Sequence, residues 1–156
     1  MTNLFFPALN FPPIDGRFRK NADGVAQVFD AVRKKFVALS PEEWVRQHLI
    51  HYLIEHKGIP SSVISVEKQL VLNGTRKRTD VVVFNAAPRP LVIAECKAPS
   101  VQLDQLVVNQ ILRYNLSLQV PFLFITNGLK HISLRIDGSE PQILNDFPEY
   151  TLLKSF

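Results

Sequence analysis

The sequence predicts an α/β (α+β) fold in which helices flank a mixed central sheet. Two apolar runs rich in β-branched residues, Val81–Phe84 and Leu91–Ala94, are typical of buried strands. Pro121–Thr126 is wholly apolar, as expected for a central strand covered on both faces. Ser40-Pro41-Glu42-Glu43 is a helix start, because Ser40 can cap the helix and Glu43 completes a capping box. Strand and helix signals therefore alternate along the chain.

The predicted order is α–β–β–β–α–β–β after an irregular N-terminal arm. The first helix runs from Ser40 to about Lys57, where Gly58 ends it. Asn73-Gly74 is a strong hairpin signal between the first two strands. The expected strands are 63–72, 76–84, 91–97, 121–126 and 131–136, with the second helix at 103–118 and a loose strand in the last twenty residues.

The first 24 residues differ in composition from the rest of the chain. They are rich in Pro, Phe and Asn, which predicts an irregular arm held to the body by its phenylalanines, Phe5, Phe6, Phe11 and Phe18. Two extended pieces follow, 26–32 and 35–39, and fit either a small hairpin or a loop with strand character. We expect residues 25–156 to form a single domain, since a chain of 156 residues is long enough for one core.

The formal charge of +4 comes from 18 basic and 14 acidic residues, and the basic residues cluster. Such clusters suit a polyanionic partner, DNA or RNA, but a solvated basic surface explains them equally well. A single cysteine, Cys96, excludes an internal disulfide, and no run is long enough for a transmembrane helix. We predict a cytoplasmic protein without membrane contact. The basic clusters are 17–20, 33–35 and 76–78.

Acidic side chains stand at the ends of the two β-branched runs. Asp80 precedes the first run, Glu95 follows the second, and Lys97 comes two residues later. If the runs pair as a hairpin, both carboxylates lie at one end of the sheet, with Glu95 and Lys97 on the same face. Burying such charges is costly unless they are paired or bind a metal. Either a divalent cation or the basic residues 76–78 could satisfy them.

The pattern of Asp80 followed by Glu95-Cys96-Lys97 resembles the PD-(D/E)XK nuclease superfamily, with Thr79 in place of the usual proline. The chain is more specifically similar to the N-terminal nuclease domain of type I restriction enzyme R subunits, in a stand-alone form. The similar segments are Ser-Pro-Glu-Glu-Trp-Val-Arg-Gln at 40–47, Lys-Arg-Thr-Asp-Val-Val-Val at 77–83, Ala-Glu-Cys-Lys-Ala-Pro at 94–99, and Gln110-x-x-x-Tyr114.

The resemblance implies a restriction-endonuclease-like core and a Mg²⁺-dependent endodeoxyribonuclease, with Mn²⁺ as a substitute. Asp80, Glu95 and the backbone carbonyl of Cys96 would bind the metal. Lys97 would position the attacking water or stabilise charge on phosphorus. Residues implied to hold DNA are Gln110, Tyr114, Arg78 and Arg113.

Glu43 has two competing roles at this stage. In the resemblance it is the helix carboxylate that reaches the catalytic site, whereas in a capping box it turns back to the Ser40 amide. We favour the catalytic role. Glu42 cannot simply replace it, because consecutive helical residues point about 100° apart.

The sequence contains no G-x-x-x-x-G-K-[ST] loop, so it carries no ATP-driven motor of its own. The expected partner is DNA, with RNA not excluded, and a homodimer or partner subunits could supply specificity or a motor. The alternative function is a nucleic-acid-binding or partner-dependent restriction or repair subunit without activity alone.

Overall fold

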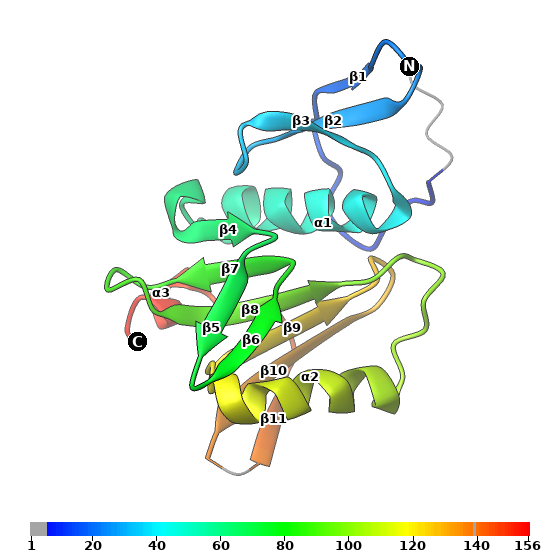
Figure 1. The fold of residues 1–156 in the computed structure, drawn as a ribbon. Helices are drawn as coiled ribbons and strands as arrows, with labels where there is room; N and C mark the ends of the chain where they lie inside the picture. Colours follow the sequence, from blue (N-terminus) through cyan, green and yellow to red (C-terminus); the bar gives the residue numbers. More distant parts are fainter. Residues whose placement is uncertain (1–5, 139) are drawn as a thin grey trace.

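The computed structural model describes residues 6–138 and 140–156, so Phe5 of the predicted arm lies outside the described part. Figure 1 shows a layered molecule in which a small N-terminal sheet, helix α1, the central sheet and helix α2 follow one another. The fold is mixed α+β, as predicted, with a restriction-endonuclease-like arrangement of sheet and helices. None of the described helices is both long and apolar enough to cross a membrane.

The small N-terminal sheet has the order β1 (Phe18–Lys20), β2 (Ala26–Asp30), β3 (Lys35–Ala38). The predicted hairpin of 26–32 and 35–39 is present as β2 and β3. Residues 18–20 were expected in the irregular arm but pair with β2 as a third strand. Asn21 makes this possible, since its Oδ1 accepts hydrogen bonds from the backbone N–H groups of Asp23 and Val25 and closes the turn.

Aromatic contacts join the N-terminal segment to α1, as the sequence predicted. The ring of Phe6 stacks on Trp44 with centroids 5.6 Å apart, and Phe18 approaches the same indole at 6.3 Å. Phe11 packs against Tyr52 at 5.7 Å. The Trp44 Nε1 also donates to a backbone carbonyl of this segment, at Pro7.

Helix α1 spans Pro41–His51 and continues as one turn of π-helix, Tyr52–His56. Ser40 caps it as predicted, because its Oγ accepts from the Glu43 N–H at 3.0 Å. Val45, Leu49 and Leu53 are fully buried against the central sheet.

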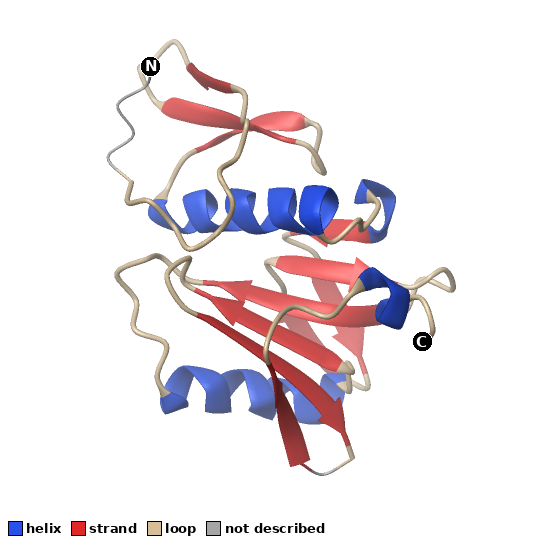
Figure 2. Cartoon of the chain, turned by 180° about the vertical axis from the view of Figure 1, so that it is seen from behind, coloured by secondary structure: helices blue, strands red, loops and turns tan. Residues whose placement is uncertain are grey.

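The central sheet has six strands in the order β11-β10-β9-β8-β7-β4. Only β8 and β9 are parallel, and α2 makes the crossover between them, so the sheet is mixed as predicted. Figure 2 shows α1 and α2 on opposite faces of this sheet. The bounds are β4 Ile64–Val66, β7 Val81–Phe84, β8 Pro90–Cys96, α2 Gln105–Leu118, β9 Phe122–Thr126, β10 His131–Asp137 and β11 Glu140–Leu144, with a 3-10 turn at Ser61–Val63 and a short helix α3 at Tyr150–Leu153.

Two predicted strands, 63–72 and 76–84, are each broken in the middle. Their outer halves form a separate hairpin, β5 (Gln69–Leu72) and β6 (Thr75–Arg78), that leaves the central sheet. At the break Glu67 adopts a left-handed φ of 54°, while its N–H still donates to Asp80 O at 2.9 Å. The hairpin bends over α2, where the Asn73 side chain donates to Ser117 O at 2.7 Å. Local strand propensity continues across the break, so the sequence alone does not reveal it.

The turn of this hairpin has the predicted geometry. Asn73 and Gly74 both have positive φ, 49° and 77°, as a two-residue type I′ turn requires.

Asp30 fastens the N-terminal sheet to α1. Its Oδ1 accepts from the backbone N–H groups of Val32 and Arg33, and its Oδ2 accepts from Arg33 Nε at 2.7 Å and Gln47 Nε2 at 2.8 Å. Burial alone would raise the pKa of Asp30, but the hydrogen bonds from Arg33 and Gln47 outweigh it and the pKa is lowered. The charged carboxylate therefore stabilises the folded protein.

Asp30→Asn tests this junction. A lowered folded-state pKa means that the stabilisation is present above about pH 4 and is lost as the pH falls through the folded pKa. We expect the variant to lose about 1–3 kcal/mol of unfolding free energy at neutral pH and to show a shallower acid dependence. Urea unfolding from neutral to acidic pH measures both, with exposed Asp23→Asn as control. An unchanged acid dependence would contradict the assignment.

Candidate active site

Asp80 lies at the break between β6 and β7. Its Oδ2 accepts from the Cys96 backbone N–H at 2.8 Å, which ties it to the end of β8. Its Oδ1 accepts from Arg46 Nη2 at 3.2 Å. The break thus lets a strand-end carboxylate turn toward both the neighbouring strand and α1.

Glu95 and Lys97 contact each other at the end of β8, with Nζ and Oε1 3.3 Å apart. A second ammonium, that of Lys77 on β6, lies 3.7 Å from Glu95 Oε2. The sequence prediction did not single out Lys77, although it belongs to the basic cluster 76–78. Glu95 is only 14% exposed, so both ammonium groups face a carboxylate that is largely removed from water.

The strand register places Asp80 and Glu95 at the same end of the β7–β8 pair. Val82 pairs with Ile93 and Val81 with Ala94, so one further step places Asp80 opposite Glu95. Val82 and Ile93 pack in the apolar cluster beneath α2, and strand alternation places Glu95 on that face, whereas Asp80 lies outside β7 and its carboxylate turns to Arg46 on α1.

Arg46 on α1 is the centre of a buried charge network. Its guanidinium contacts Glu42 at 3.2 Å, Asp80 at 3.2 Å and Glu67 at 3.5 Å, and it also pairs with Glu43. Burial by itself would lower the pKa of Arg46, but the charges of Glu43 and Asp80 outweigh it and raise that pKa. The group stays charged while its side chain is 5% exposed. The spacing of Arg46 from Glu42 and Glu43 is a helical i, i+4 and i, i+3 pattern that could have indicated these pairs.

The carboxylate of Glu43 binds side chains other than those of the helix cap. It pairs with Arg33 and Arg46 and accepts from Gln47 Nε2 at 2.9 Å, and the residue is 6% exposed. Glu43 is thus connected to Asp80 through the guanidinium of Arg46, which contacts both carboxylates.

Glu42 also lies close enough to the site for the charges there to affect it, although the sequence favoured Glu43 as the catalytic carboxylate of the helix. Burial raises the pKa of Glu42, and the negative charges of Asp80 and Glu95 add to this effect against Arg46 and Lys97. Its side chain is 47% exposed, in contrast to that of Glu43. The carboxylate open to solvent beside the strand-end acids is therefore that of Glu42.

The residues predicted to hold DNA lie on α2 and β6. Gln110, Arg113 and Tyr114 are exposed on α2, and Lys77 Nζ lies 4.7 Å from the centre of the Tyr114 ring. Arg78 is 72% exposed and contacts Glu67 at 3.4 Å. Tyr114 is thus linked to Glu95 through Lys77.

Cys96 is fully buried, and burial raises the pKa of its thiol well above the usual value. The thiol is therefore protonated at neutral pH, so Cys96 contributes to this site through its backbone.

Residues 41–148 match the family described as the type I restriction enzyme R protein N terminus. The chain belongs to this family. No curated protein and no solved structure matched it. Membership gives this type I restriction R-protein domain a nuclease-related role, and the family in general implies a DNA substrate and partner subunits.

The site of this restriction R-protein domain offers a partial set of metal ligands. Within residues 6–138 and 140–156, no group of three or more His, Cys, Asp or Glu side chains is arranged to hold a metal ion. Mg²⁺ is usually bound by one or two carboxylates and completed by water and substrate phosphate, and Asp80 and Glu95 are carboxylates of the kind it needs, although basic side chains pair with both of them here. Restriction nucleases in general use divalent metals.

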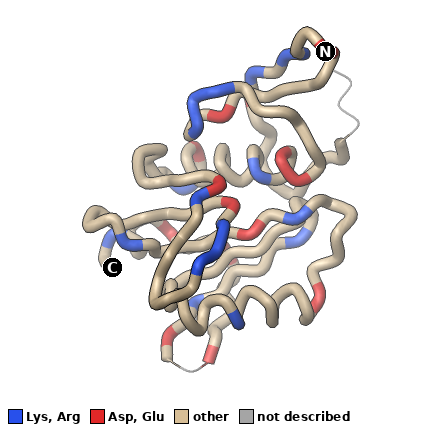
Figure 3. Tube along the Cα trace, in the orientation of Figure 1, with Lys and Arg blue, Asp and Glu red and all other residues tan. Residues whose placement is uncertain are grey.

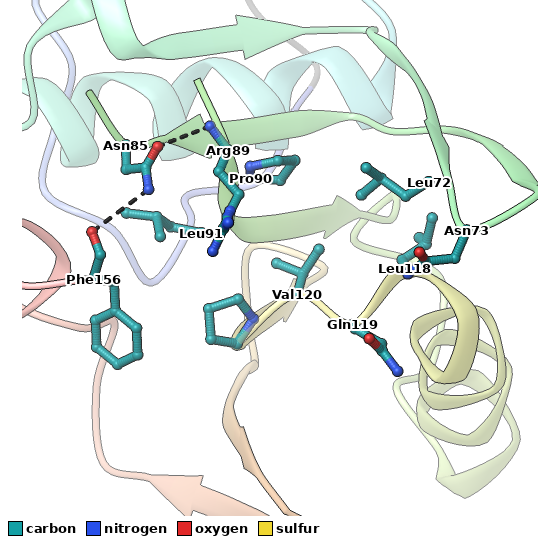
Figure 4. Close-up of a pocket in the computed structure, with 11 residues that line it drawn as sticks. Leu72, Asn73, Asn85, Arg89, Pro90, Leu91, Leu118, Gln119, Val120 and Phe156 are labelled. Carbon is teal, nitrogen blue, oxygen red and sulfur yellow. Dashed lines mark hydrogen bonds between the residues drawn. The ribbon is translucent and has the colours of Figure 1, made fainter. Parts of the chain in front are cut away.

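A cavity of about 510 Å³ in this R-protein domain lies at the other end of β8 from Glu95. Figure 4 shows Pro90 and Leu91 at its wall, with Asn85 bonded to the Arg89 N–H and to Phe156 O. The length of β8 separates it from the acidic cluster, so it is not part of this site.

Replacing Arg46 tests the charge network. Arg46→Ala leaves the acids around it without their shared cation, and we expect the free energy of unfolding to fall by about 3–5 kcal/mol. Chemical unfolding gives the value, and exposed Arg89→Ala is the matched control, with a change within about 0.5 kcal/mol. Equal stability of the two variants would contradict the structural role of Arg46.

Proposed function

We propose that this protein is a divalent-metal-dependent nuclease that hydrolyses DNA phosphodiester bonds. The observation that carries the proposal is the contact of Asp80 with the Cys96 N–H at the end of β8, next to the paired Glu95 and Lys97, in a chain of a restriction-enzyme family. Carboxylates next to basic residues are suited to binding a cation and a phosphate together.

In this proposal Asp80, Glu95 and the Cys96 carbonyl hold Mg²⁺ or Mn²⁺. When bound, such an ion supplies positive charge to the phosphate and lowers the pKa of a coordinated water. Glu95 orients Lys97, whose ammonium then faces the attacking water or the phosphate oxygens. Lys77 lies on the other oxygen of Glu95 and adds positive charge toward Tyr114.

DNA would reach this site along α2 and β6. Gln110 and Arg113 on α2 and Arg78 on β6 are exposed, so they can contact phosphates without losing buried partners.

A second candidate is a partner-dependent subunit that binds nucleic acid without cleaving it alone. The contact that favours it is Arg46 on Asp80, since the guanidinium occupies an oxygen that a metal would need. A partner or substrate that displaces Arg46 would then complete the site.

A cytoplasmic location of the protein is also a prediction from the sequence.

Cleavage of plasmid and single-stranded DNA with Mg²⁺ or Mn²⁺ tests the nuclease proposal. Asp80→Ala, Glu95→Ala and Lys97→Ala should each reduce the rate by roughly 100-fold or more, as expected when a charge-stabilising group is lost. Glu149→Gln is the matched control, because Glu149 also pairs with a lysine, Lys57, but away from this cluster. Cleavage that survives the three substitutions would refute the site; binding without cleavage by the unmodified protein would favour the second candidate.

The neighbouring acids of α1 allow a paired test. Glu43→Gln should lower stability by about 1–3 kcal/mol, because it removes a buried charged partner of Arg33 and Arg46. Glu42→Gln should leave stability within about 0.5 kcal/mol and lower the cleavage rate, because its carboxylate is the more accessible one. Thermal unfolding and cleavage rates of both variants separate the roles, and the opposite pattern would return the catalytic role to Glu43.

A further inference from the structure

We propose that the outward face of the N-terminal sheet β1–β3 binds a single-stranded segment of the DNA substrate. The proposal rests on the nuclease function proposed above and extends the DNA contact to a part of the chain that precedes the family match. It starts from the arrangement of arginine and aromatic side chains on that face.

The two faces of this sheet differ. Val28 and Asp30 on β2 are fully buried toward α1, so strand alternation turns Gln27 and Phe29 outward. Their cross-strand partners share that face: Arg19 lies opposite Gln27, and Phe36 opposite Phe29. Figure 1 shows the sheet on the side of α1 away from the central sheet, so this face is not covered by the body of the domain.

Guanidinium groups lie over the aromatic rings on the outward face. Arg19 Cζ is 3.8 Å from the centre of the Phe36 ring, and Arg17 Cζ is 4.5 Å from that of Phe29. The two rings hold each other edge to face at 5.4 Å, and Arg19 Nε is fixed by Gln27 Oε1 at 2.8 Å. Because the guanidinium groups cover the rings, the groups that the rings hold in place are the outermost surface, on which a base can stack and which also carries positive charge toward the phosphates.

The charge of this face favours a polyanion such as nucleic acid over a basic or apolar protein segment. None of the outward positions of β1–β3 carries an acid, and exposed Lys34 and Lys35 extend the positive charge at the β2–β3 turn. In Figure 3 the basic segments follow β1 and this turn and reappear along β6.

The edge of the N-terminal sheet at the β2–β3 turn approaches the candidate active site. Arg33 in the β2–β3 turn contacts Glu67 at 3.4 Å, and the same carboxylate contacts Arg78 at 3.4 Å. Arg78 is one of the residues proposed to hold DNA. A strand that passes the active site along β6 can therefore continue over Lys34 and Lys35 onto the outward face.

The test is binding of a fluorescent thymidine oligonucleotide to the full chain, followed by anisotropy with EDTA present so that no cleavage occurs. Phe36→Leu should weaken binding roughly tenfold, as the loss of one stacked base predicts, and Phe36→Tyr should retain it. Arg19→Gln should reduce the slope of log affinity against log salt by about 0.7, the value for one phosphate contact on a single strand. Arg135→Gln is the matched control. Arg135 lies on β10, outside the N-terminal sheet, and its guanidinium also lies over aromatic rings, those of Phe122 and Phe156.

Unchanged single-strand affinity in Phe36→Leu overturns the proposal, as does an equal loss on a duplex of the same length, which would indicate backbone contacts without stacking. Loss of binding in Phe36→Tyr also overturns the proposal, because this variant keeps the aromatic ring and the ring would then not account for binding. The outcome is separate from the nuclease proposal: the metal-free binding measurement stands even if the unmodified protein does not cleave DNA.

Discussion

The buried guanidinium of Arg46 is the constraint on which the rest of the site depends. It joins acids from α1, from the break after β4 and from the start of β7, so three segments distant in sequence share one cation. A buried charge with several partners fixes geometry more than it adds net stability, since desolvation offsets most of the attraction. Arg46 thereby sets the distance between α1 and the end of the central sheet.

The break in the long β4–β7 hairpin is the second constraint. By turning β5 and β6 over α2, it moves Lys77 and Arg78 from the plane of the sheet to a position above its end. Glu67 adopts a left-handed backbone conformation at the break. Its carboxylate contacts three arginines, Arg33, Arg46 and Arg78. Bulge-like breaks often re-aim side chains next to functional sites, and here Asp80 is the residue re-aimed.

Much of the fold and of the candidate site could be predicted from the sequence, because the cap and turn signals agree with the period of the strands. The Ser40 cap, the Asn73-Gly74 turn and the strand-end positions of Asp80, Glu95 and Lys97 depend only on neighbouring residues. The third strand β1 depends on the local turn at Asn21, whereas the break in the hairpin and the contacts of Arg46 with Glu67 and Asp80 depend on residues distant in sequence. The uncertainty over Glu43 arose for the same reason, since Arg33, one of its partners, precedes α1 and no spacing rule connects the two.

The contact between Arg33 and Glu43 has a consequence for where the domain can be cut. The family match begins at residue 41, yet Arg33 and Asp30 reach across that boundary to Glu43 and Gln47, and Phe18 and Phe6 lie against Trp44. A fragment that starts with α1 would expose the indole and leave a buried carboxylate with one cation fewer. The contacts that hold α1 in place therefore extend beyond the segment matched by the family, into the N-terminal sheet.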